Sequence, residues 1–116
     1  MKCNLDLVLS ILQSLEGVEP NHPIGGLTDE NYTQDIINYH IDLLINNGFV
    51  DGSNLRGIGD EDDIFNINGL TWKGHEFIRY AIKDDSIWTK GKEIAVSQTT
   101  SATIGWLLEW LKLQFS

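Results

Sequence analysis

The sequence predicts an α+β, mostly helical fold: a winged helix-turn-helix domain with a C-terminal helical extension. Three observations favour it. Apolar residues recur at spacings of three and four through most of the 116-residue chain, as in amphipathic helices. Two short extended segments in the middle of the chain read as a hairpin. The order of these segments, helices followed by a hairpin and further helices, is the winged-helix order.

The first helix is expected from about Asn4 to Glu16. Its apolar residues recur every three or four positions, and Asn4 suits the helix start. Gly17 follows, where many helices end. The next stretch, residues 18–26, holds both prolines of the chain and reads as a loop with room for a short extended piece.

The second helical region spans residues 28–47, which is long enough for a short helix beginning near Thr28, a turn and a longer helix from Thr33 to Asn46. Extended segments are then expected at residues 49–55 and 64–67, joined by a long loop rich in glycine and acidic residues. Together they predict a hairpin with a long tip.

Three more helices are expected after the hairpin. Thr71 is a favourable N-cap for the first, and Asp84 marks its end. A weaker helix begins near Ile87, and the last covers residues 102–115. Trp72 and Trp88 are predicted to pack the helix after the hairpin onto the core. The predicted organisation is a winged-helix-like domain at residues 1–99 and a hydrophobic helix at residues 100–116, packed on the same domain or on a partner.

The acidic charge is concentrated in one half of the chain. The formal net charge is −9. Residues 1–70 hold twelve acidic and two basic residues, a net charge of −10, whereas residues 71–116 hold five acidic and six basic residues, a net charge of +1. Non-specific affinity for nucleic acid comes from basic charge. The half that would contact DNA in a winged helix is therefore the acidic half.

The segment LTWKGHEFIRYAIKDDSIWTKGKE, residues 70–93, resembles the signature of domain of unknown function 2513, a bacterial and prophage family. Three further stretches are similar: the opening of the chain at residues 1–12, the helix and strand start at residues 37–52, and the hydrophobic C-terminal tail. The resemblance implies a winged-helix-like domain from a bacterium or phage. It implies no activity and transfers no catalytic residue.

DNA binding is the first function to weigh. In a winged helix, the helix before the hairpin enters the major groove. Gln34 and Asn38 on this helix could read adenine edges, with Arg56 in the hairpin tip and Lys73 behind. The helix carries no Lys or Arg, and the tip also holds four consecutive acids at residues 60–63. These charges disfavour contact with phosphate.

Metal, cofactor and catalytic sites are not expected. The single cysteine, Cys3, forms neither a disulfide framework nor a zinc cluster within the chain. His22, His40 and His75 show no metal-binding spacing, and His40 and His75 are expected to be partly buried and bonded to backbone. The acidic run at residues 60–63 lacks the pattern of a calcium loop. We therefore expect a protein that is not an enzyme.

The last helix is the strongest candidate for contact with another protein. Its apolar arc is wide, with one stripe at Ile104, Leu107, Leu108, Leu111 and Phe115 and a neighbouring face at Trp106, Trp110 and Leu113. A helix that is apolar nearly all round must be buried, and aromatic residues are common in interfaces. The predicted interface residues are Ile104, Trp106, Leu107, Leu108, Trp110, Leu111 and Phe115. The alternative is that this helix closes the core over the first helix.

The sequence thus predicts a non-enzymatic bacterial or prophage accessory protein that acts by protein–protein contact and self-associates, as a dimer, through its last helix. The alternative is a DNA-binding winged-helix transcriptional regulator. A third hypothesis is that the acidic half competes with nucleic acid for a basic partner. A cytoplasmic location is expected, because no long apolar run or signal peptide is present and one cysteine suits a reducing compartment.

Overall fold

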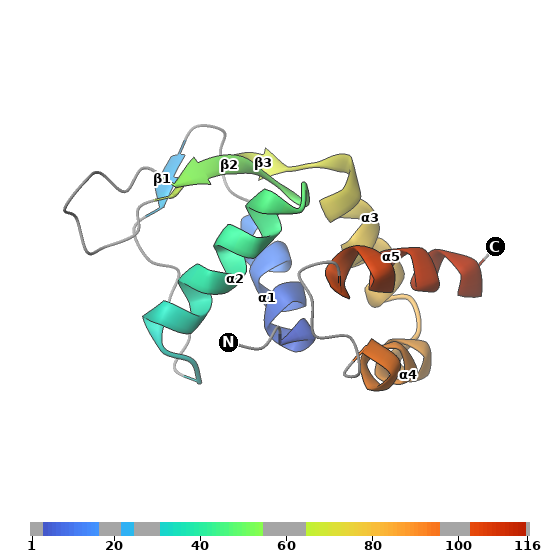
Figure 1. Ribbon diagram of the computed structural model, residues 1–116. Coiled ribbons are helices and arrows are strands. Elements are labelled where there is room, and N and C mark those ends of the chain that lie inside the picture. Colours follow the sequence, from blue (N-terminus) through green and yellow to red (C-terminus); the bar gives the residue numbers. More distant parts are fainter. Residues whose placement is uncertain (1–3, 17–21, 25–30, 55–64, 96–102, 116) are drawn as a thin grey trace.

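The computed structural model describes residues 4–16, 22–24, 31–54, 65–95 and 103–115 (Figure 1). Within these residues the chain is α+β and mostly helical, as predicted. Its elements, in order, are α1 (Leu5–Leu15), β1 (His22–Ile24), α2 (Gln34–Asn46), β2 (Val50–Asn54), β3 (Phe65–Leu70), α3 (Trp72–Ala81), α4 (Asp85–Ala95) and α5 (Thr103–Gln114). The short helix expected near Thr28 lies outside the described residues.

Polar side chains set the starts of the helices. Asn4 accepts a hydrogen bond at Oδ1 from the backbone N–H of Leu7 and begins α1. Thr33 and Thr71 do the same with their hydroxyl groups at the starts of α2 and α3. Asp84 accepts from two backbone N–H groups at the start of α4. These contacts satisfy N–H groups that have no partner within the helix, which is why the predicted helix starts at Asn4 and Thr71 are confirmed.

The three strands form one antiparallel sheet in the order β1-β3-β2. In the β2–β3 hairpin Val50 pairs with Leu70, and the register shifts after Asp51. Gly69 has a φ of 151°, a conformation that glycine adopts without a side-chain clash, and it lies at this irregularity. The short extended piece for which residues 18–26 had room is β1, which pairs with β3.

The core lies around α1, which packs against α2, α3 and β3 at the centre of the molecule (Figure 1). Leu7, Val8 and Leu12 are almost completely buried there. A row of aromatic rings extends the core from the sheet towards α4: Phe49 meets Phe77 edge to face at 5.8 Å, and Phe77 meets Trp88 in the same way at 5.7 Å. Edge-to-face contact is the favourable arrangement for such rings.

The start of α3 is fixed against the turn between α2 and β2. Gly48 has a φ of 80°, which ends α2 with a left-handed residue. The hydroxyl of Thr71 donates to the Gly48 carbonyl, and the N–H of Thr71 donates to the Phe49 carbonyl. Gly74 lies so close to the Phe49 carbonyl that a Cβ at this position would clash with it. The hairpin and α3 are therefore held in one arrangement relative to α2.

The last two helices, α4 and α5, pack against each other beside α3. α5 contacts both α4 and α3 (Figure 1). Gly91 of α4 faces Leu107 and Trp110 of α5, and the absence of a side chain at Gly91 allows this close approach. Lys92 of α4 forms an ion pair with Asp6 of α1 at 2.7 Å. None of the described helices is long and apolar enough to cross a membrane.

Candidate functional site

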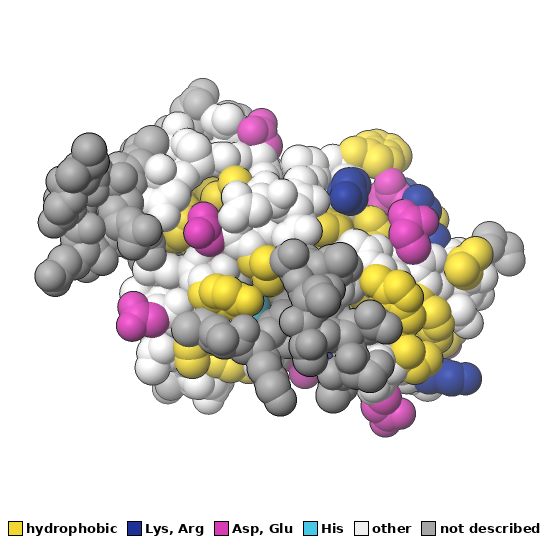
Figure 2. Space-filling model, in the orientation of Figure 1, with side chains coloured by type: hydrophobic (Ala, Val, Ile, Leu, Met, Phe, Trp, Pro, Cys, Tyr) yellow, Lys and Arg dark blue, Asp and Glu magenta, His cyan; other side chains and the backbone are white. Residues whose placement is uncertain are grey.

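The outward face of α2 is acidic. Ile37, Ile41 and Leu44 bury the inner face against the core. Asp35 is exposed and Asp42 is half-buried, two turns apart on the side away from the core. Among the described residues in Figure 2, no Lys or Arg stands beside the acidic side chains over α2 and the sheet. This face would repel a phosphate backbone.

The side-chain amides of Gln34 and Asn38, which were predicted to contact DNA bases, are hydrogen-bonded to each other. Gln34 donates from Nε2 to Oδ1 of Asn38 over 2.7 Å, and Asn38 is only 9% exposed. Arg56 lies outside the described residues. Lys73 stands on α3, where its Nζ is 3.4 Å from the Asn47 carbonyl and 4.8 Å from the centre of the Phe49 ring. The structure therefore does not bring Gln34, Asn38 and Lys73 together on one open face.

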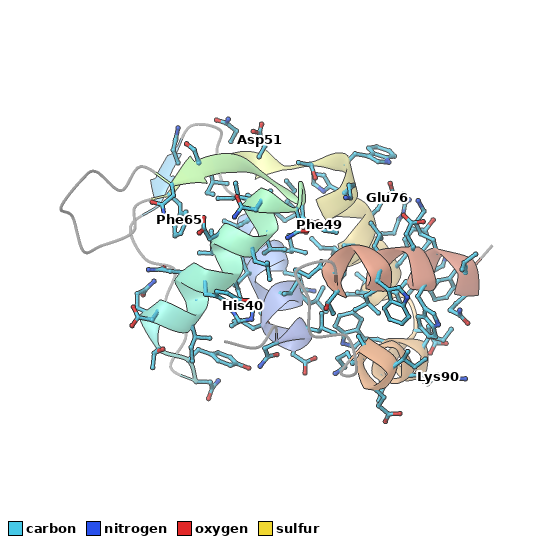
Figure 3. All side chains as sticks on the ribbon, viewed as in Figure 1. His40, Phe49, Asp51, Phe65, Glu76 and Lys90 are labelled. Carbon is cyan, nitrogen blue, oxygen red and sulfur yellow. The ribbon has the colours of Figure 1, made fainter. Side chains whose placement is uncertain are left out.

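Positive charge lies elsewhere in the molecule. Within the described residues, every Lys and Arg lies between Lys73 and Lys112, on α3, α4, α5 or the turn after α3. Three of these cations lie near carboxylates or carbonyl groups: Lys73 near Asn47, Lys92 on Asp6, and Lys112 near Glu76. On β2, Asp51 adds another acidic group and projects from the sheet away from the helices (Figure 3). The asymmetry of charge seen in the sequence is thus also an asymmetry in space.

His40 is bonded to backbone, as predicted, and it is more completely buried than the partial burial that was expected. It is 0% exposed and lies between α2 and α1 (Figure 3). Nε2 accepts from the backbone N–H of Asn4 at 2.8 Å, so Nδ1 carries the proton and donates to the Ile36 carbonyl at 2.7 Å. Burial lowers the pKa of His40, and the bond to Ile36 opposes this in part. The neutral imidazole is the form that fits both bonds.

The prediction for His75 is wrong. Its side chain is 52% exposed and points towards Glu16, with 3.9 Å between Nδ1 and the carboxylate. It lies beside the buried side of α3, which Gly74, Phe77, Ile78 and Ala81 form, and its ring extends into solvent. Within the described part of the chain, no group of three His, Cys, Asp or Glu side chains is arranged to hold a metal ion. Cys3 and residues 60–63 lie outside that part.

Trp72 also departs from its predicted role. Trp88 is buried against Phe77, as expected, but Trp72 is 73% exposed. Trp72 is the first residue of α3, and the buried positions Gly74, Phe77 and Ile78 point to the other side of that helix. The spacing of five residues between Trp72 and Phe77 already indicates this difference. Five residues correspond to well over one helical turn, so the two side chains lie on different sides of α3.

α5 divides into an inner and an outer face. The described inner face is buried in the chain's own core and consists of Thr103, Ile104, Leu107, Leu108 and Leu111. An interface built from all seven predicted residues is therefore not what the structure shows, because four of them fill this core. Trp106, Trp110 and Phe115 remain partly exposed, and Leu113 is 71% exposed.

Trp106, Trp110 and Leu113 form what we call the outer face of α5. They follow at intervals of four and three residues and so lie on one side of the helix. The rings of Trp106 and Trp110 are stacked, with 6.5 Å between their centres. Figure 2 shows apolar side chains gathered over α5 and α4. Leu113 lies on this face but was not among the predicted interface residues, although its spacing from Trp106 indicates that the two residues share a side of the helix.

Phe115 belongs to a separate cluster at the end of α5. Its ring stacks on Tyr80 of α3, with 5.9 Å between the centres. Lys83 lies over both rings, 5.7 Å from the centre of Tyr80 and 4.9 Å from that of Phe115. These contacts fasten the end of α5 to α3, and they give Phe115 a structural role within the chain.

These features define a small helical chain with a three-stranded sheet, an acidic outer surface on α2 and an apolar outer face on its last helix. The sequence model of one family, described as hypothetical protein (DUF2513), matches residues 2–101, and the chain belongs to that family. The match confirms the resemblance seen in the sequence, but it ends before α5, so the C-terminal tail is outside it. No curated protein and no solved structure matches the chain.

Proposed function

We propose that this chain is a non-enzymatic bacterial or prophage accessory protein that works through contact with other protein chains and self-associates through α5. The distribution of charge favours this function over DNA binding, because the described residues from 4 to 70 carry acidic groups and no Lys or Arg. The outer face of α5 supplies the contact surface. Trp106, Trp110 and Leu113 offer two aromatic rings and one exposed apolar side chain, the kind of group that dominates binding energy in interfaces.

We also propose that residues 1–99 form a winged-helix-like domain. The chain order α1, β1, α2, β2, β3 and the sheet order β1-β3-β2 support it. In this assignment α2 is the helix that a DNA-binding member would place in the major groove, and β2 with β3 forms the wing. The acidic outer side of α2 makes this unit a scaffold for protein contact.

A DNA-binding transcriptional regulator is the second candidate, because the proposed winged-helix arrangement favours it. A dimer could present two copies of α2 to two half-sites. This function requires Gln34 and Asn38 to give up their mutual hydrogen bond and requires Arg56 to contact phosphate. Its affinity would therefore fall with salt and with the Arg56→Ala substitution.

Two measurements on the full chain separate the candidates. Sedimentation equilibrium over a wide concentration range should show a reversible monomer–dimer transition, and random-sequence and genomic duplex DNA at low salt should give no retarded complex. A chain that stays monomeric at high micromolar concentration contradicts self-association. Salt-sensitive binding to duplex DNA that Arg56→Ala weakens would establish the regulator instead.

A further inference from the structure

No further inference is drawn: the strongest candidate, the apolar outer face of α5 formed by Trp106, Trp110 and Leu113, carries nothing beyond the proposed function, because nothing in the structure shows what covers it.

Discussion

The Nε2 atom of His40 accepts a hydrogen bond of 2.8 Å from the backbone N–H of Asn4, and this bond joins α2 to the start of α1. Asn4 is also the N-cap of α1, and its side-chain amide donates to the hydroxyl of Tyr32 at 3.1 Å. One residue thus caps a helix and connects two distant segments. A protonated imidazole has no acceptor at Nε2, so the bond requires the neutral ring.

Stability should therefore fall with acidification in a defined range. Burial lowers the pKa of His40 from its ordinary value of 6.5. The unfolded chain then binds this proton at a higher pH than the folded chain does. The contribution of neutral His40 is complete above about pH 7.5, begins to fall as pH drops through about 6.5, and continues to fall towards the lower pKa of the folded state. Urea unfolding from about pH 7.5 to about pH 5.5 measures it.

His40→Gln provides the comparison for this pH dependence. The variant should be less stable at neutral pH, and its stability should change less between about pH 7.5 and about pH 5.5. His75→Gln is the control, because His75 is half exposed and holds no buried hydrogen bond. An equal loss of pH dependence in both variants would contradict the role assigned to His40.

Substitution of Trp88 and of Trp72 should have very different effects on the free energy of unfolding. Trp88→Ala removes a buried ring that packs on Phe77, and it should lower the free energy of unfolding by about 3–5 kcal/mol. Trp72→Ala removes a ring that is 73% exposed and should change that free energy by no more than about 0.5 kcal/mol. Chemical denaturation of both variants checks this. A large loss in Trp72→Ala would show that this ring packs on the core.

Two helical glycines form a second matched pair. A Cβ at position 74 would clash with the Phe49 carbonyl, which belongs to backbone and cannot rotate away. Gly74→Ala should therefore cost about 1–3 kcal/mol. At Gly105 of α5 no atom lies within 4 Å of such a Cβ, and Gly105→Ala should stabilise by about 0.5–1 kcal/mol. Equal effects of the two substitutions on the urea midpoint would contradict the close packing of α3 on the turn between α2 and β2.

Much of the fold could be predicted because local chemistry determines it. The caps at Asn4 and Thr71 and the apolar periodicity of α1 place helices without reference to the rest of the chain. Trp72 shows where this reasoning stops. A tryptophan near buried residues was expected to be buried, but its burial depends on its phase relative to Phe77 and on what packs opposite, which is a tertiary property. The same holds for Gly91, whose role appears only when α5 lies against it.

The candidate site shows a similar division. The sequence predicts the wide apolar arc of α5 and the acidic half of the chain. It could not assign Ile104 and Leu107 to the chain's own core, because an apolar stripe fits an intramolecular contact as well as an intermolecular one. Likewise, the hydrogen bond between Gln34 and Asn38 depends on side-chain geometry. Spacing indicates which residues share a face, and packing decides what that face meets.

The measurement that tests the central claim most directly is sedimentation equilibrium of Leu113→Glu beside Ile82→Glu. Both residues are large, apolar and exposed, at 71% and 56%, but only Leu113 lies on the outer face of α5. We predict that Leu113→Glu is folded and monomeric at concentrations where the unaltered chain and Ile82→Glu are dimers. A Leu113→Glu chain that dimerises as well as Ile82→Glu would contradict self-association through α5.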